Sequence, residues 1–150
     1  VAKRDCQPPT DIRHKEVKKD ASLGLLQITW KHSTRKEISN VGHSFHMYFE
    51  DKDNQSVLTG KPLTETPKLQ QFCFLWGQTD GQGSEHTVDG RKCASEALHL
   101  IHWNGDKYSK VAEALDKLDG FAIVTVFLKL GLCNKNLKGV LKALDSVKTK

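Results

Sequence analysis

The sequence predicts a mainly β domain with a few surface helices, built around a largely antiparallel sheet. Short runs rich in β-branched and aromatic residues recur along the chain, and turn signals such as DKDN, TDGQG and NGD separate them. The chain has 150 residues, 37% of them hydrophobic. A chain of this length can bury roughly 68 to 70% of its unfolded surface, so a single domain over residues 1–150 is expected.

The strands are expected in a definite order along the chain. The first twenty or so residues are polar and contain prolines, which predicts an extended arm with little regular structure. Six strand-like runs follow, and they read LLQITW, SFHMYFE, SVLTG, KLQQFCFLW, EALHLIHW and FAIVTVFLKL. The last run is apolar on both faces for most of its length, which predicts a central strand covered on both sides.

Two later segments have helical rather than strand periodicity. The first runs from Tyr108 to Leu118, and Gly120 follows it as a stop signal. The second runs from Leu137 to Val147, with an apolar stripe on one face and lysines on the other. Both are expected to be surface helices.

The composition argues against several classes of partner. The 23 basic and 18 acidic residues are scattered, so no nucleic-acid-binding stripe is predicted. No apolar run approaches the ~20 residues of a membrane span. The four cysteines, Cys6, Cys73, Cys93 and Cys133, are widely spaced, and nothing at the start resembles a signal peptide. Reduced thiols and a cytoplasmic location are therefore expected.

Strand alternation indicates which polar side chains could form a metal site. In KLQQFCFLW, Gln71, Cys73 and Leu75 share one face, and in EALHLIHW the residue His99 shares a face with Ile101. If the two strands are antiparallel neighbours, Cys73 and His99 meet on one face of the sheet, and thiolate and imidazole are both zinc ligands. The alternative is a satisfied core histidine beside a cysteine that acts as a small hydrophobe.

Three further polar residues are candidates for a role. His43 follows a glycine and is a candidate proton carrier, because an unperturbed imidazole titrates near pH ~6.5. Glu85 and His86, within GQGSEHTVDG, are a candidate buried acid–imidazole pair. The alternative for each is an ordinary loop residue. No P-loop, dinucleotide-binding pattern or nucleophile elbow is present in the sequence.

Several ordered motifs together resemble an α-class carbonic anhydrase, with the closest likeness to the vertebrate cytosolic isozymes. They are QPPTDI, NVGHSFHMYFED, GSEHTVDG, LHLIHWN, FLKLG and LDSVKTK, and they cover nearly the whole chain. The resemblance implies a large twisted, mainly antiparallel sheet and the reversible hydration of carbon dioxide to bicarbonate. It also implies zinc held by three histidines, which lowers the pKa of bound water to about 7.

The resemblance implies a damaged metal site. The family pattern is Gln-Phe-His-Phe-His-Trp where this chain has QFCFLW, so Cys73 and Leu75 replace two of the three zinc-ligand histidines. His99 matches the third ligand, and Gln71 matches a residue that orients a ligand. The next strand carries one extra residue, so Ala97 stands where a supporting glutamate is expected, unless a bulge returns Glu96 to the site.

The surroundings of the site are better preserved. His43 matches the proton-shuttle histidine of the family, and His46 matches a position that faces the cavity in some isozymes. Glu85 and His86 match a buried pair whose glutamate accepts a hydrogen bond from a threonine. The positions that match the apolar wall of the carbon dioxide pocket are Ile101, Phe121 and Ile123.

The resemblance also implies an incomplete domain. The family continues beyond LDSVKTK with a Thr-Thr-Pro-Pro loop and further strands, and it has an aromatic segment before QPPTDI. Neither has a counterpart here, so truncation at both ends is expected. The threonine that orients the zinc hydroxide would be missing, and open sheet edges would favour self-association.

These substitutions imply a catalytically silent or severely impaired carbonic anhydrase-like protein with zinc absent or weakly bound. The alternative is a zinc-dependent lyase acting on carbon dioxide and bicarbonate, in which His46 or a shifted Glu96 joins Cys73 and His99. A thiolate ligand would raise the pKa of the metal-bound water and weaken hydration at neutral pH. A third reading is an unstable product that aggregates through its sheet edges.

Overall fold

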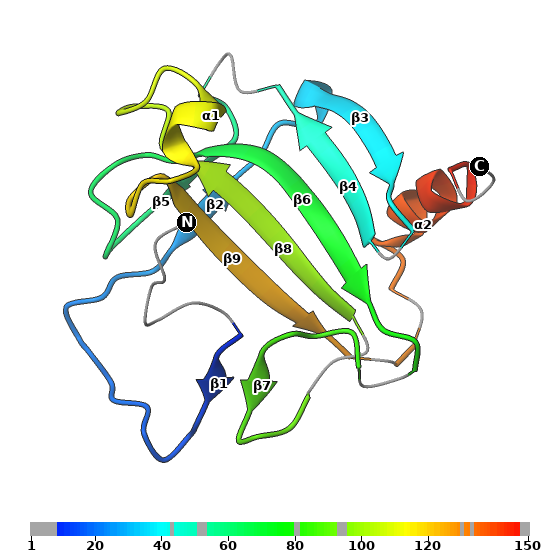
Figure 1. The fold of residues 1–150 in the computed structure, drawn as a ribbon, viewed down its shortest axis with the longest axis horizontal. Helices are drawn as coiled ribbons and strands as arrows, with labels where there is room; N and C mark the ends of the chain where they lie inside the picture. Colours follow the sequence, from blue (N-terminus) through cyan, green and yellow to red (C-terminus); the bar gives the residue numbers. More distant parts are fainter. Residues whose placement is uncertain are drawn as a thin grey trace.

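The computed structural model describes residues 9–42, 44–50, 54–79, 82–92, 96–129, 131–132 and 134–147. Within these ranges a seven-stranded sheet dominates, and a two-stranded sheet lies beside it (Figure 1). The mainly β fold class expected from the sequence is confirmed. Within the same ranges no helix has the length and apolar character that crossing a membrane requires.

The large sheet is antiparallel throughout. Its strands are β2 (Gln27–Thr29), β3 (Arg35–Asn40), β4 (Ser44–Phe49), β5 (Val57–Thr59), β6 (Lys68–Trp76), β8 (Glu96–Trp103) and β9 (Phe121–Leu128). The order across the sheet is β3, β4, β6, β8 and β9, while β5 pairs with the start of β6 and β2 pairs with β5. The small sheet joins β1 (Asp11–Ile12) to β7 (Thr87–Val88) in parallel. The long strand β6 therefore lies at the centre, between β4 and β8 (Figure 1).

All six strand-like runs form strands, and a further long strand comes from a segment that sequence patterning did not mark. That segment is β3, with the sequence RKEISN, in which Ile38 is the only large apolar residue. Four of its six residues are exposed. Pairing with β4 holds the segment extended, so its strand character comes from its neighbour rather than from its own periodicity.

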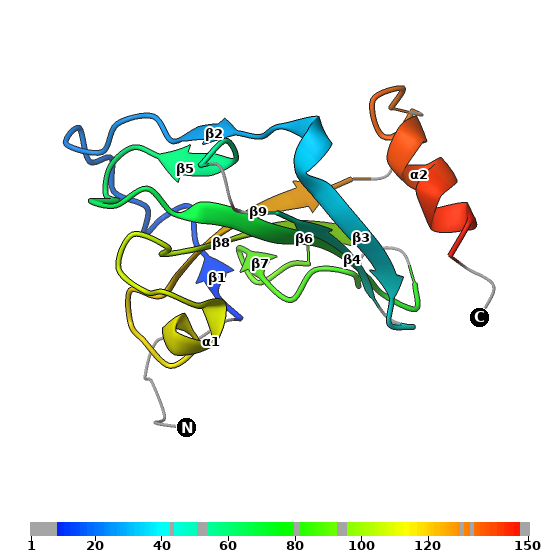
Figure 2. The same ribbon diagram turned by 90° about the horizontal axis from the view of Figure 1, so that it is seen from above.

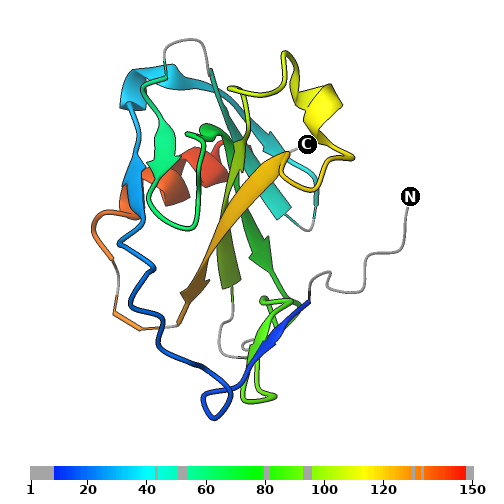
Figure 3. The same cartoon turned by 90° about the vertical axis from the view of Figure 1, so that its left-hand side faces the viewer.

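The expectation that FAIVTVFLKL is a central strand is wrong. This run forms β9, which pairs with β8 alone among the strands that the structure describes. Ile123 and Val126 are 54% and 41% exposed. Figure 3 shows β9 on the outer side of the sheet. Apolar residues on both faces indicate a strand, but they do not specify how many strands flank it.

The first predicted helix is much shorter than expected. The segment Tyr108–Leu118 contains only α1 (Val111–Ala114), which is followed by turns. Leu115 and Leu118, which lie in these turns, are 69% and 86% exposed. Within α1, Ala114 is fully buried.

The chain turns back after α1 because Asp119 and Gly120 hold the turn. The carboxylate of Asp119 pairs with the Lys107 ammonium and accepts a hydrogen bond from the Tyr108 hydroxyl at 2.6 Å. Gly120 packs against the carbonyl group of Ala114 so closely that a Cβ would lie 1.9 Å from its oxygen. Tertiary contacts of the turn thus override the helical periodicity.

The second predicted helix is confirmed as α2 (Lys138–Asp145). Leu137 and Val140 pack against a core cluster on one face of the sheet, made of Phe45, Met47, Phe49, Leu69, Phe74 and Leu100. Figure 2 shows α2 on one side of the sheet and α1, β1 and β7 on the other. The face opposite the core cluster, on the side of β7, is therefore the one that carries Cys73.

Candidate functional site

Four residues form a continuous row across the face of the sheet opposite the core cluster. His46 of β4 lies opposite Cys73 of β6, Cys73 lies opposite His99 of β8, and His99 lies opposite Thr125 of β9. We call these four residues the cross-strand row. Cβ atoms of directly opposite residues are about 4.5–5.5 Å apart, and their side chains share one face. Cys73 therefore has an imidazole on each side.

Cys73 and His99 are buried although they lie outside the main core cluster. Their exposed fractions are 7% and 9%. The Nε2 atom of His99 and the Nδ1 atom of His46 are buried without a hydrogen-bond partner among the described residues. A buried polar atom without a partner costs about 1–3 kcal/mol, so these nitrogens are suited to a ligand.

Burial keeps both members of the central pair uncharged near neutral pH. Desolvation raises the pKa of the Cys73 thiol above 9.0, and the nearby Glu85 charge adds to the effect. Desolvation lowers the pKa of His99 below 6.5; His86 also lowers it, while Glu85 opposes the change. The pair therefore consists of a thiol and a neutral imidazole.

His46 flanks the thiol on the β4 side. Its Nε2 atom lies 2.9 Å from the Ser44 hydroxyl oxygen, so this nitrogen is engaged along its own strand. The ring is tilted against Tyr48, with centroids 6.1 Å apart. The structure thus places His46 on the face that the resemblance implied, but only its Nδ1 is left for another group.

The bulge that would return Glu96 to the site is not present. Leu75 pairs with Ala97 and Trp76 pairs with Glu96 without a break in register. The shift between β6 and β8 instead falls between Leu69 and Gln71. The backbone pairing therefore continues in register from Cys73–His99 to Trp76–Glu96.

His86 lies against the cross-strand row from a different part of the chain. Its ring stacks on that of His99 with centroids 6.2 Å apart, and the edge of Phe127 lies 6.5 Å away. The backbone N–H of Thr10 donates to His86 Nδ1 at 3.0 Å. Since a backbone N–H can only donate, the neutral imidazole carries its proton on Nε2.

The expectation that the Glu85 carboxylate is buried is wrong, because this residue is exposed. Ser84 turns inward, where its hydroxyl donates to the His86 carbonyl at 2.9 Å, and the next residue points outward. Glu85 is nevertheless close enough to influence the pKa values of Cys73 and His99. It is best described as a charge at the rim of the site.

The remaining predicted residues extend the same face. Gln71 lies opposite Tyr48 and Ile101, and Ile101 lies opposite Ile123. Phe121 is half-buried opposite Trp103, whereas Ile123 is more than half exposed, so these apolar residues are partly open to solvent on the β9 side. His43 lies outside the described residues.

Sequence reasoning missed Thr125 and Phe127. Both share strand parity with Phe121 and Ile123, which was the signal available in the sequence. Their relevance depended on the register of β9 against β8, since that register places Thr125 directly beside His99. The cross-strand row therefore ends on β9 with the hydroxyl group of Thr125.

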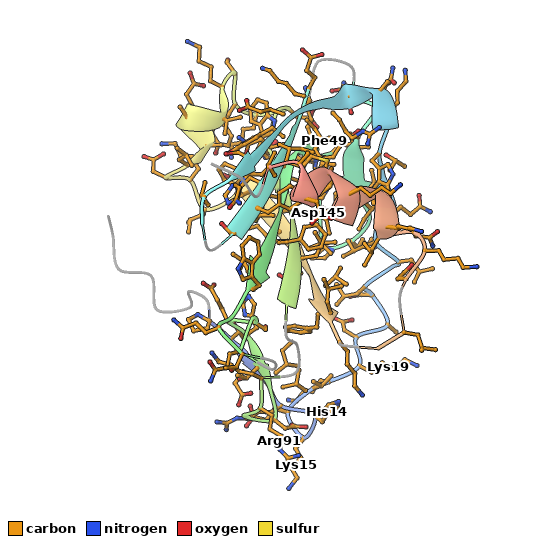
Figure 4. The ribbon with its side chains drawn as sticks, turned by 90° about the vertical axis from the view of Figure 1, so that its right-hand side faces the viewer. His14, Lys15, Lys19, Phe49, Arg91 and Asp145 are labelled. Atoms are coloured by element: carbon orange, nitrogen blue, oxygen red, sulfur yellow. The ribbon has the colours of Figure 1, made fainter. Side chains whose placement is uncertain are left out.

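A second group of charged residues surrounds an open depression of about 560 Å³ at the β1–β7 sheet, lined by Asp11, Arg13, His14, Lys15, Glu16, Asp89 and Gly90. Figure 4 shows His14, Lys15 and Arg91 at this end of the molecule, away from Phe49. Arg13 pairs with Asp11 at 3.0 Å, and His14 pairs with Asp89 at 2.6 Å. The contact between His14 and Asp89 joins the segments that follow β1 and β7.

The donor set does not fit a catalytic zinc ion. Such a site takes three protein ligands and leaves one position for water. Within the described ranges, no three histidine, cysteine, aspartate or glutamate side chains are grouped so that they could hold one metal ion. Cys73 and His99 provide two neighbouring donors, and Leu75 provides none.

Comparison with known proteins identifies related sequences. The family model for eukaryotic-type carbonic anhydrase matches residues 1–150. Carbonic anhydrase 1 of Monodelphis domestica is 54% identical over 150 residues, covering all of this chain and 57% of that protein. Carbonic anhydrase 1 of Oryctolagus cuniculus is 55% identical over 144 residues, or 96% of this chain and 60% of that protein. The chain thus spans less than two thirds of the length of these curated relatives.

Proposed function

Because the chain belongs to the eukaryotic-type carbonic anhydrase family, we propose that it is a member in which hydration of carbon dioxide is absent or severely impaired. In the resemblance described above, the zinc-ligand positions are Cys73, Leu75 and His99. A leucine side chain has no atom that binds a metal. Zinc, when bound by three ligands, supplies a hydroxide near neutral pH, and this chain does not offer three such ligands at these positions.

The cross-strand row is the observation that carries this proposal. It places one thiol and one imidazole side by side, and the pairing of β6 with β8 continues in register from there to Trp76. The apolar wall, in contrast, persists in Ile101 and Phe121. These apolar residues support the proposal that the outline of a carbon dioxide pocket is kept while the means of activating water is reduced.

Metal analysis and a repair experiment test the proposal. The full chain, dialysed against a mild chelator, should contain well under one zinc per molecule and hydrate carbon dioxide at the buffer rate in stopped-flow assays. The double variant Cys73→His, Leu75→His should gain one zinc. The matched control Trp76→His adds a histidine to the opposite face of the same strand and should gain none. One tightly bound zinc with measurable hydration in the unaltered chain would overturn the proposal.

A second candidate function is zinc-dependent hydration through an improvised site. The observation in its favour is the unpartnered, buried Nδ1 of His46, which flanks Cys73 directly. If this candidate is correct, His46→Ala should abolish both zinc binding and hydration. Hydration that survives this substitution would exclude His46 as the third ligand.

The proposed location is the cytoplasm, where a thiol such as Cys73 stays reduced. Neither nucleic acid nor a membrane is proposed as a partner. The reason is the scattered distribution of 23 basic and 18 acidic residues. Fractionation of cells that express a tagged chain tests the location, and appearance of the chain in the medium would contradict it.

A further inference from the structure

We propose that Cys73 and His99 form a two-coordinate site for copper(I), held between the central strands β6 and β8. This inference rests on the proposed loss of the three-histidine zinc site. It names the class of cation that the remaining donors select, namely a soft monovalent ion in place of a divalent one.

Two independent observations mark this pair as a ligand site. The first is a buried thiol directly opposite a buried histidine on the neighbouring strand, so that the two side chains share one face of the sheet. The second is the His99 Nε2 atom, which belongs to a side chain 9% exposed and has no hydrogen-bond partner among the described residues. A bound cation would satisfy this nitrogen.

The chemistry of the donors selects a soft cation. Thiolate ligands favour copper(I), whereas calcium and magnesium require several oxygen ligands. Copper(I) is stable with two ligands, while zinc prefers four. Leu75 and Ile101, which neighbour the pair along the same face, are apolar and add no donor.

Charge balance also favours a monovalent ion over a divalent one. Without a metal, the pair is a thiol and an imidazole buried opposite each other. When copper(I) binds, the Cys73 S–H bond breaks, a Cu–S bond forms and the proton leaves to solvent. Copper stays in the +1 state and the buried pair stays neutral overall. Zinc(II) would leave one uncompensated positive charge in the same buried place, which is costly.

His46 is not required as a ligand. Its Nε2 is engaged by Ser44, and it lies on the far side of Cys73 from His99. The two-coordinate assignment therefore predicts that His46 can be changed with little effect on copper affinity. The same substitution would remove a ligand from the improvised zinc site. A change at His46 therefore distinguishes the copper(I) site from that zinc site.

Anaerobic competition for copper(I) against bicinchoninate, followed by the absorbance of the chelate, tests the site. The full chain is used in a background where Cys6, Cys93 and Cys133 are serine, so that Cys73 is the single thiol. One copper per chain is expected. Cys73→Ser and His99→Ala should each weaken binding by about 100-fold or more, because even an outer partner of a metal ligand is worth 10- to 100-fold.

Controls distinguish coordination from loss of folding. His46→Gln should change copper affinity by less than about threefold, and a loss as large as that of His99→Ala would overturn the two-coordinate assignment. X-ray absorption of the copper-loaded chain should show one sulfur and one nitrogen neighbour. Equal copper binding by Cys73→Ser, with circular dichroism unchanged, would refute the site. If the chain neither hydrates carbon dioxide nor binds copper, the copper site is refuted but the proposed loss of hydration is not. Zinc-dependent hydration by the unaltered chain would refute the proposed loss of hydration.

Discussion

Cys73 and His99 lie directly opposite each other on β6 and β8, and both side chains are buried. Their neighbours on the outer strands, His46 and Thr125, continue the same row. Burial shifts the two central pKa values in opposite directions and leaves both groups neutral. Because these groups are buried in their uncharged forms, the free energy of unfolding should depend on pH, and this dependence can be measured.

The first prediction concerns His99 and mild acid. Desolvation, assisted by the neighbouring His86, lowers the folded-state pKa of His99 below 6.5, and Glu85 opposes the shift. The unfolded chain therefore binds more protons below that pH, so the free energy of unfolding should fall as the pH drops below about 6.5. His99→Asn should show a smaller difference between urea midpoints at pH 7.5 and pH 5.5.

The buried His102 provides the comparison for this experiment. Its pKa is also lowered by burial, so the unaltered chain carries two such contributions. His99→Asn should remove one and leave the other. An unchanged pH dependence in this variant would show that His99 is not desolvated as the structure indicates.

The second prediction concerns the turn after α1. A Cβ at position 120 would lie 1.9 Å from the Ala114 oxygen, which belongs to the backbone and cannot move without shifting α1. Gly120→Ala should therefore reduce the free energy of unfolding by about 3 kcal/mol. Urea denaturation measures the change.

Gly139 is the matched control for this substitution. It lies in α2, and a Cβ there meets no atom within 4 Å. Gly139→Ala should stabilise the chain by up to about 1 kcal/mol, since alanine is the better helix former. A similar loss of stability in both variants would contradict the close contact at Gly120.

The third prediction concerns Asp119, whose pKa is lowered to about 2, mainly by the Lys107 ammonium and the Tyr108 hydroxyl. A carboxyl with a lowered folded-state pKa contributes stability that is present above the unfolded value of 3.8 and is lost as pH falls towards about 2. Carbon NMR of the side-chain carboxyl should show this low midpoint. Lys107→Met should move the midpoint upward, and an unmoved midpoint would exclude the ion pair as its main cause.

The fourth prediction concerns self-association through β9. This strand has no charged residue, its Ile123 and Val126 are exposed, and it pairs with β8 alone among the described strands. Uncharged edge strands tend to pair with other chains, so sedimentation velocity should show concentration-dependent oligomers. Ile123→Lys should reduce them. Leu132→Lys, at a fully exposed position outside β9, should not.

Much of the site could be anticipated from the sequence. Strand alternation alone placed Gln71, Cys73 and Leu75 on one face of β6, and the bounds of β6 and β8 agree with the runs that predicted them. The replacement of two ligand positions by Cys73 and Leu75 could also be read directly, because the neighbouring residues of that strand match the family pattern. These features are local, so a single segment determines them.

Other features depended on which segments lie side by side. The alignment of His46, Cys73, His99 and Thr125 follows from the register of four strands, and the exposure of Glu85 follows from the turn around Ser84. The edge position of β9 and the early end of α1 have the same origin.

The sequence by itself therefore determined strand identity, the facing of side chains and the chemistry of the donors, since alternation is a property of one extended segment. Only the tertiary structure decided that Cys73 lies directly opposite His99 and that the pairing runs without a bulge from there to Trp76. The physical reason is that register is set by pairing between distant segments, and a shift of one residue moves every side chain to the opposite face.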